Sequence, residues 1–183
     1  MDRRQRKTRE AIFSAFTRLL SQKDFNQITV GEIIEQADIG RATFYAHFET
    51  KDYLLKAFCE ELFCHIFDTE QDGVCSHKHI FECDGSDSAF LHLFRHLQKN
   101  DHNILSLLSS RNNDLFLQYF RGGLEVLIAR HLSLFAPRKA TEIPDAFWQD
   151  HIASVFVATL RWWIAHGMQE SPEQITEYFF TVV

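Results

Sequence analysis

Residues 28–51 read Ile-Thr-Val-Gly-Glu-Ile-Ile-Glu-Gln-Ala-Asp-Ile-Gly-Arg-Ala-Thr-Phe-Tyr-Ala-His-Phe-Glu-Thr-Lys. The apolar residues of the first half recur at the i, i+3, i+4 and i+7 spacing of one helix face: Val30, Ile33, Ile34 and Ala37. Thr29 precedes that face, where its hydroxyl can accept a hydrogen bond from an unpaired backbone N–H. Asp38-Ile39-Gly40 then interrupts the pattern. The segment therefore predicts a short helix followed by a tight turn.

Residues 41–48 are expected to form a second short helix. Phe44 and Phe48 lie four positions apart and are expected to face inward. The other face then carries the polar side chains Arg41, Thr43, Tyr45 and His47. Two short helices joined by a tight turn have the geometry of a helix-turn-helix, in which the second helix enters the major groove of DNA.

Specific residues of this segment also carry a family resemblance. They are Thr29-Val30-x-x-Ile33, Ala37, Ile39, Thr43-Phe44-Tyr45-x-His47-Phe48 and Lys51. In spacing and aromatic order they resemble the TetR/AcrR family of bacterial transcriptional regulators, over about residues 4–58. Beyond about residue 60 the chain is similar only in being helical and rich in aromatic residues. The resemblance implies an all-helical homodimer that binds a palindromic DNA operator, usually as a repressor. It also implies release of the operator when a small molecule enters the C-terminal domain.

Base edges and phosphates of DNA are contacted by different chemical groups of a protein. Arg41, near the start of the second helix, is the expected base reader, because arginine donates two parallel hydrogen bonds to guanine. Ala42 and Ala46 can offer methyl contacts to thymine. The resemblance implies phosphate contacts from Thr29, Thr43, Tyr45, His47 and Lys51, and each of these side chains is a competent donor.

Other roles for these residues stay open. Tyr45 could pack as a half-buried side chain, His47 could cap or pack, and Arg41 could simply be solvated. Two positions depart from the family pattern: Gly40 stands where serine often opens the second helix, and Gly31 stands where a base-contacting side chain is common. The N-terminal arm, with Arg3, Arg4 and Arg6, is expected to add backbone or minor-groove contacts.

The charge distribution fits a DNA-binding N-terminus. The 183-residue chain has a formal net charge of −6, but residues 1–51 hold nine Lys and Arg against seven Asp and Glu. The remaining residues hold ten basic and 18 acidic side chains. Positive charge is therefore concentrated near the helix-turn-helix. A solvated basic N-terminus without a partner is the alternative.

Composition also bounds the class of protein. Hydrophobic residues make up 45% of the chain, which indicates a globular protein. No apolar run approaches the roughly 18–20 residues of a membrane span, and the basic start does not read as a signal peptide. We expect a cytoplasmic protein with four free cysteines, no membrane contact and no cofactor. No Gly-rich phosphate loop, G-x-S-x-G or H-E-x-x-H motif appears, so an enzyme is not expected.

The fold class is expected to be all-α, with about nine helices. Residues 1–50 would form the DNA-binding domain and residues 51–183 a helical effector-binding and dimerisation domain. Beyond the helix-turn-helix, helices are predicted over about 4–21, after Thr50, around Phe90–Leu97, and over about 104–108, 114–134, 145–166 and 171–183, with a long loop over about 68–88. Ser171-Pro172-Glu173-Gln174 has the pattern of a capping box. Gly122-Gly123, inside a predicted helix, indicate a close helix contact, a bend or plain tolerance.

The helix over 145–166 is apolar on nearly every side, so it must be covered all round. We expect it to pair with the last helix and their two copies across a two-fold axis, as a four-helix bundle. The expected interface residues are Phe156, Leu160, Trp163, Ile175 and Phe179. A central helix wholly inside one subunit is the alternative.

Aromatic residues are abundant in the C-terminal half and could line a ligand cavity, although such residues more often form a core. The expected walls are Phe63, Phe67, Phe94, Phe116 and Tyr119, which would favour an apolar or aromatic effector. A protein partner that docks on the acidic half is an alternative.

Several potential metal ligands are close in sequence: Cys64, His65, Cys75, His77, His79 and Cys83. Their spacing matches no standard zinc pattern. Free thiols and solvent-facing histidines are the preferred interpretation, so no metal is expected, and metal or redox sensing at this segment is the alternative.

Overall fold

The structure is a computed structural model that describes residues 3–68, 88–99, 104–109 and 114–183. Within these ranges the regular elements are all helical, which confirms the expected all-α class. The α-helices are α1 (Arg3–Leu20), α2 (Val30–Gln36), α3 (Arg41–His47), α4 (Lys51–Asp68), α5 (Ala89–Gln98), α6 (Ile104–Ser109), α7 (Asp114–Arg130), α8 (Leu132–Phe135), α9 (Asp145–Ala165) and α10 (Pro172–Val182). Two 3-10 turns, η1 (Phe25–Gln27) and η3 (Ala136–Arg138), complete the described elements.

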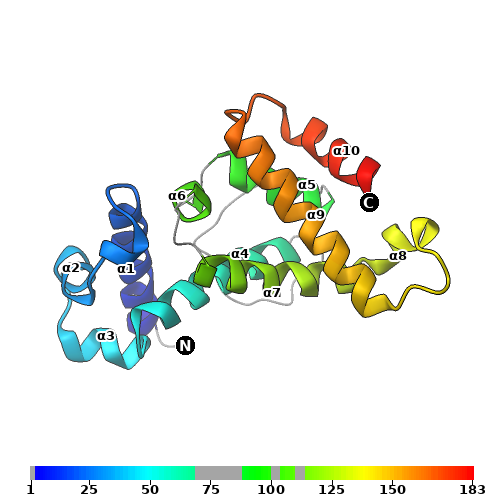
Figure 1. Ribbon diagram of the computed structural model, residues 1–183. Coiled ribbons are helices and arrows are strands. Elements are labelled where there is room, and N and C mark those ends of the chain that lie inside the picture. The colour runs from blue at the N-terminus through cyan, green and yellow to red at the C-terminus, as the bar shows by residue number, and fades with distance from the viewer. Residues whose placement is uncertain (1–2, 69–87, 100–103, 110–113) are drawn as a thin grey trace.

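The helices form two groups joined by α4 (Figure 1). Helices α1, α2 and α3 gather at one end, at the left of the view. α4 leads away from them and packs against α7, while α5 and α10 pack together and both α7 and α10 contact α9. The division at residues 50 and 51 stays a prediction, because α4 contacts elements of both groups.

The turn between α2 and α3 is built from the C-terminus of α2. Asp38 adopts a left-handed backbone with φ 51°. The Asp38 N–H donates to the carbonyl of Glu35, and the Ile39 N–H donates to the carbonyl of Ile34, 3.2 Å in each case. This pair of bonds is the Schellman motif that commonly ends a helix. It redirects the chain within a few residues and lets α3 start at Arg41.

Side-chain caps start three of the helices where the sequence predicts them. Thr29 caps α2 in a capping box with Glu32, and Ser171 caps α10 in a capping box with Gln174. Thr50 Oγ1 accepts from the Tyr53 N–H at 3.0 Å and caps α4. The helix predicted over 114–134 is instead interrupted at His131, which separates α7 from α8. The loop predicted over 68–88 lies almost wholly outside the described residues.

The core of the C-terminal group is aromatic. Phe94 of α5 stacks on Phe156 of α9 with ring centroids 4.7 Å apart, and Phe156 meets Phe179 of α10 edge-on at 5.3 Å. Phe94 also lies edge-on to Trp163 at 5.8 Å. Pairs in these arrangements stabilise a core beyond the burial of their surface. They hold α5, α9 and α10 together as one layer.

This core corrects the predicted dimer interface. The expected residues are each 0% exposed in the single chain: Phe156, Leu160, Trp163, Ile175 and Phe179. A side chain that its own chain covers completely offers no surface to a second chain. Their apolar character therefore serves the contact of α9 and α10 with α5 and with each other. A dimer surface on these helices has to use other side chains.

Gly123 lets α4 and α7 approach closely. A Cβ atom at this position would lie 2.2 Å from Cδ2 of Phe63 on α4, whereas a Cβ at Gly122 would meet no atom within 4 Å. Of the three explanations for the glycine pair, the close helix contact therefore holds for Gly123. Gly122 lies on an exposed side of α7 and has no such constraint.

The two glycines give a matched test of this packing. Gly123→Ala should destabilise the protein by about 1–3 kcal/mol, because the Phe63 ring has to move out of a packed position. Gly122→Ala should stabilise it by up to about 1 kcal/mol, because alanine favours a helix and its methyl group meets open space. Denaturant unfolding followed by circular dichroism measures both. Equal changes in the same direction would contradict the close contact of α4 and α7.

Candidate nucleic-acid interface and ligand pocket

The outer face of α3 is open to solvent. Its exposed residues include all three expected base readers and two of the expected phosphate donors: Arg41, Ala42, Thr43, Tyr45 and Ala46. Phe44 and Phe48 are 0% exposed on the opposite side. The structure therefore places five of the eight predicted contact residues on the exposed side of α3. α3 lies at the outer edge of the molecule, where a duplex can reach it (Figure 1).

The aromatic residues beneath α3 fix its orientation. Phe48 meets Phe13 of α1 edge-on at 5.6 Å, and the Phe44 and Phe48 ring centroids lie 6.1 Å apart. Tyr45 is 48% exposed, and its ring meets Phe44 edge-on at 5.5 Å. Tyr45 is therefore half-buried against Phe44, as the packing alternative expects, and its phosphate contact stays a prediction. The face that it shares with Arg41 is presented on a rigid base.

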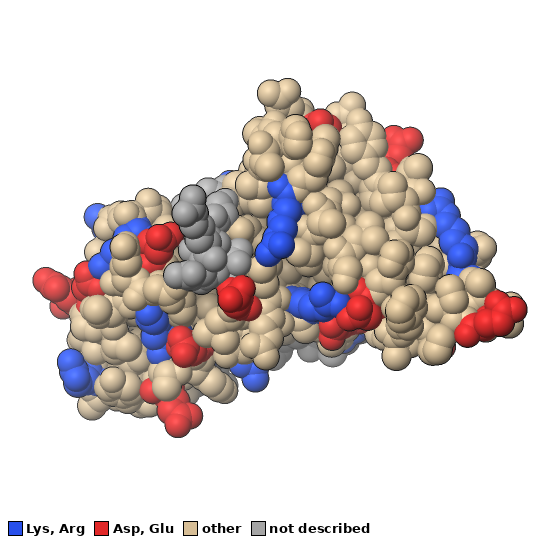
Figure 2. All heavy atoms as spheres, viewed as in Figure 1, with Lys and Arg blue, Asp and Glu red and all other residues tan. Residues whose placement is uncertain are grey.

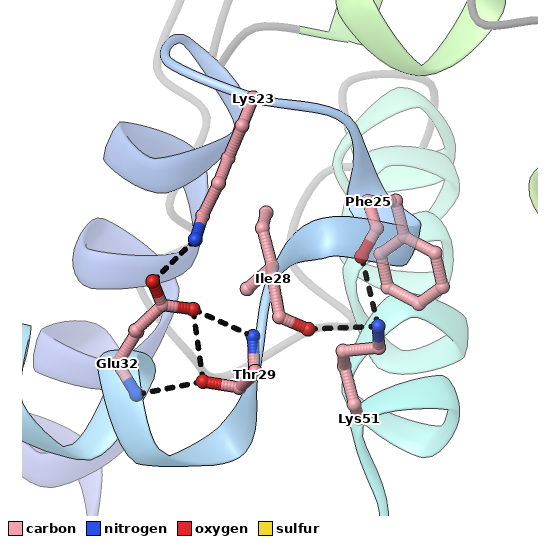
Figure 3. Close-up of polar contacts among 6 residues, drawn as sticks. All are labelled: Lys23, Phe25, Ile28, Thr29, Glu32 and Lys51. Carbon is pink, nitrogen blue, oxygen red and sulfur yellow. Dashed lines mark hydrogen bonds and ion pairs between the residues drawn. The ribbon is translucent and has the colours of Figure 1, made fainter.

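Thr29 is held at the N-terminus of α2 by a closed set of hydrogen bonds (Figure 3). Its hydroxyl accepts from the Glu32 N–H at 3.3 Å and donates to Glu32 Oε2 at 2.8 Å. The Thr29 N–H donates to the same carboxylate oxygen at 2.9 Å. The ion pair with Lys23, together with these bonds, lowers the pKa of Glu32 from 4.5 to about 2. Thr29 therefore has a structural role, and its phosphate contact stays a prediction.

Lys51 has an internal role that sequence reasoning missed. Its Nζ donates to the carbonyls of Phe25 and Ile28, both at 2.8 Å, and lies 4.2 Å from the centroid of the Phe25 ring (Figure 3). Burial lowers the pKa of Lys51. Two of its three ammonium hydrogens thus connect the first residue of α4 to the turn before α2. A phosphate contact would have to use the third.

Arg9 is a second structural cation in the basic N-terminal segment. Its guanidinium lies 5.0 Å from the Phe13 ring centroid and 5.2 Å from that of Phe48, and Nη2 contacts Glu61 Oε1 at 3.1 Å. It therefore joins α1 to α4 over the aromatic base of α3. Burial, with a smaller effect of Arg9, lowers the pKa of the half-buried His47. The neutral imidazole retains one N–H that can donate to a phosphate.

The two glycines that depart from the family pattern occupy ordinary backbone. Gly40 is the N-cap of α3 with φ −79° and ψ 154°, so the position tolerates a side chain, but none caps the helix. Gly31 is exposed on α2. α2 therefore has no side chain at Gly31 to offer DNA, and base reading by Arg41 stays a prediction.

Charges of both signs lie over the α1–α3 group. On the face in Figure 2, Lys and Arg alternate with Asp and Glu at this end of the molecule. This pattern agrees with a segment whose positive excess is small, nine basic against seven acidic residues over 1–51. Phosphate groups would be attracted to this surface by individual hydrogen-bond donors rather than by a broad positive electrostatic potential.

A pocket of about 410 Å³ lies between α4 and α7. Its lining residues are Lys56, Cys59, Glu60, Phe63, Cys64, Phe67, Gln118, Tyr119, Gly122, Gly123 and Val126. Three of the five residues predicted to form effector walls, Phe63, Phe67 and Tyr119, line this pocket. Phe94 and Phe116 do not line it and are buried in the core.

The Cys/His-rich segment is described only in part. Cys75, His77, His79 and Cys83 lie outside the described residues. Cys64 lines the pocket, and His65 is buried at 6% exposure rather than solvent-facing as expected. Among the described residues, every helix is too short or too polar to cross a lipid bilayer.

Comparison with known proteins matches both halves of the chain. Residues 12–58 match the family of bacterial regulatory proteins, tetR family, and residues 84–183 match a transcriptional regulator C-terminal region. A crystal structure of a TetR transcriptional regulator from Streptococcus agalactiae 2603V is 34% identical, with a TM-score of 0.73, and the match covers 100% of this chain and 96% of that chain.

Two curated relatives match more locally. The uncharacterized HTH-type transcriptional regulator YxbF of Bacillus subtilis (strain 168) is 39% identical over 71 residues, 36% of this chain and 19% of YxbF. An uncharacterized HTH-type transcriptional regulator of Haemophilus influenzae is 33% identical over 81 residues, 43% of each chain. The chain therefore spans less than half of the length of either relative.

The protein has a helix-turn-helix whose second helix is exposed, and its described elements are all helical. Together with the match of residues 12–58, these features place the protein among DNA-binding transcriptional regulators rather than enzymes. The match of the C-terminal region and the full-length similarity to the streptococcal structure narrow the class to one family. The chain belongs to the TetR family of bacterial transcriptional regulators.

Lys51→Met should destabilise the protein by about 1–2 kcal/mol, because the carbonyls of Phe25 and Ile28 lose a charged donor. Lys56→Met is the matched control on the same helix, since among the described residues its ammonium pairs with the exposed Glu60 at 3.8 Å. Urea unfolding measures both variants. If Lys51→Met lost DNA affinity with unchanged stability, a phosphate role would replace the structural one.

Proposed function

We propose that the protein is a repressor that binds a palindromic DNA operator as a homodimer and leaves it when a small apolar or aromatic molecule binds between α4 and α7. The observation that supports this most strongly is the exposed face of α3. It presents Arg41 in its first turn, and its other side rests on buried Phe44 and Phe48. A helix fixed in this way holds its donors in place before DNA arrives.

Base reading depends on Arg41. The residue is exposed at the N-terminus of α3, the end of a recognition helix that contacts base edges. Ala42 and Ala46 add exposed methyl groups on the same face. Thr43, Tyr45 and His47 supply phosphate donors around them, and these set the register of the helix on the duplex. The third hydrogen of Lys51 Nζ and the hydroxyl of Thr29 would contribute at the edge of this surface.

Homodimerisation is supported by apolar side chains that α9 and α10 leave exposed. They are Phe147 at 62%, Trp162 at 44%, Tyr178 at 47% and Val182 at 62%. Figure 2 shows that the surface over these two helices, at the upper right, is mostly free of charged groups. A two-fold pairing of α9 and α10 with their copies would cover this face and place two α3 helices for two half-sites.

The pocket is suited to an effector because α4 forms one of its walls. Phe63, Phe67 and Tyr119 provide apolar surface, and the exposed Lys56 and Glu60 offer polar groups. The same helix begins at Lys51, against the helix-turn-helix. A ligand that prefers one position of α4 would therefore favour one spacing of the two reading helices, and a ligand with no such preference would not release DNA.

Arg41→Ala should weaken binding to the operator by about 1–3 kcal/mol and relax the preference at one base pair of each half-site. Tyr45→Phe removes one phosphate donor and should weaken all sequences alike, so it is the matched control. Fluorescence anisotropy on the operator, single-base variants and random duplex measures both. Equal losses on operator and random DNA for Arg41→Ala would refute base reading by this residue.

Gly122→Phe should block the pocket without unfolding the protein, because the position opens into free space. The apolar dye anilinonaphthalene sulfonate should bind the wild type saturably and the variant at least about tenfold more weakly, since an occupied site excludes it. Leu134→Phe is the control, because Leu134 is 53% exposed and outside the pocket lining. Unchanged dye binding by Gly122→Phe would contradict an effector site here.

A further inference from the structure

Three histidines meet inside the C-terminal group: His65 of α4, and His92 and His96 of α5. They are 6%, 4% and 1% exposed, respectively. Nε2 of His96 lies 3.0 Å from Nε2 of His65 and 2.9 Å from Nε2 of His92. A core position normally holds an apolar side chain, so three buried imidazoles with converging ring nitrogens indicate a specific use.

Local structure explains how the three side chains come together. His92 and His96 are four residues apart on α5, so they lie one turn apart on the same helix face. Ser88 Oγ caps the start of α5 by accepting from the Leu91 N–H at 3.3 Å, so the helix begins at a defined residue. α4 packs against α5 and brings His65 to the same point. The pair on α5 thus has the i, i+4 spacing by which helices present two imidazoles to a metal ion.

Hydrogen bonds between the three rings cannot use all three Nε2 atoms at once. A ring nitrogen of histidine carries either one hydrogen or one lone pair in the plane of the ring. Nε2 of His96 can therefore make one full hydrogen bond, although two other Nε2 atoms lie within hydrogen-bond distance of it. A cation placed where the three lone pairs converge would use all three nitrogens together.

The distances suit one ion. Nitrogens bound to zinc at about 2.0–2.1 Å in its usual tetrahedral geometry lie about 3.3–3.4 Å apart. The two Nε2–Nε2 separations, 3.0 and 2.9 Å, differ from this spacing by less than about 0.5 Å. All three ligand atoms lie within 4.8 Å of one another, so ring rotations that shift the nitrogens by about 1 Å complete the set.

We propose that His65, His92 and His96 bind one divalent transition-metal ion between α4 and α5. Three neutral imidazoles favour zinc, cobalt, nickel or copper over magnesium and calcium, which prefer oxygen ligands. Among the described residues, these three histidines form a group of side chains whose ligand atoms are close enough together to hold one metal ion. A water molecule or another donor would occupy the remaining position of a tetrahedral ion.

The position of the cluster agrees with this role. His65 follows Cys64, which lines the pocket, on the helix that leads to the helix-turn-helix. The ion would join that helix to α5, which an Arg95–Glu173 ion pair at 2.8 Å connects to α10.

The test uses full-length protein purified without a histidine tag and treated with a chelator. Titration with cobalt(II) should give one bound ion per chain with visible absorption bands, and zinc(II) should displace it. His92→Gln and His96→Gln should each weaken zinc binding by at least about 100-fold, because even an outer-shell change costs 10–100-fold. His151→Gln is the control, since His151 is exposed on α9 and stacks on Trp148. Circular dichroism checks that each variant is helical.

Two results would overturn the proposal: wild-type protein that binds neither cobalt nor zinc, or folded His92→Gln and His96→Gln variants that bind zinc as tightly as the wild type. If the variants fail to fold, X-ray absorption of zinc-loaded wild type decides. Nitrogen scatterers at about 2.0–2.1 Å with an imidazole pattern support the site, and sulfur at about 2.3 Å contradicts it. These measurements need no DNA, so their failure is distinct from a failure of operator binding.

Discussion

The ammonium group of Lys51 bound to the carbonyls of Phe25 and Ile28 is the contact on which the rest of the arrangement depends. It attaches the first residue of α4 to the turn that precedes α2. From there α4 continues as one helix to Asp68 and packs against α7 where Gly123 removes a side chain. A single rigid element is therefore shared by the surface that faces DNA and by the wall of the pocket.

Because α4 is shared, events in the C-terminal group can reach α3 without a flexible linker. The Arg9–Glu61 ion pair and the packing of Arg9 over Phe48 add a second connection between α4 and the base of α3. A ligand in the pocket would contact α4 on its α7 side, and a metal ion held by the histidine cluster would contact it on its α5 side. Under both proposals a change in the position of α4 is the physical quantity that would couple the two sites to DNA.

Local sequence patterns were sufficient for the features that depend on neighbours along the chain. The apolar stripe of α2, the caps at Thr29, Thr50 and Ser171, and the inward Phe44 and Phe48 all follow from spacing within one or two turns. The all-α fold and the exposed face of α3 followed from the same patterns.

Features that depend on pairing of distant segments could not be predicted in this way. Lys51 reads as a surface cation, and only the fold places it beside a turn 23–26 residues earlier. Apolar residues of α9 and α10 were assigned to a dimer, because sequence shows that a face must be covered but not which chain covers it. The spacing of His92 and His96 predicts that they lie on the same face of a helix. Their approach to His65 cannot be predicted from spacing, because it depends on the packing of α4 against α5. His96 and His65 are 31 residues apart.

We propose that each chain lays one α3 helix, led by Arg41, into the major groove and that two chains bind together. Sedimentation velocity of the protein with a duplex that carries the inverted repeat beside its own gene measures how many chains bind. Two chains per duplex are expected, with an affinity that falls steeply with salt, as phosphate contacts require. A protein that stays single and shows no salt-dependent binding to the duplex would contradict it.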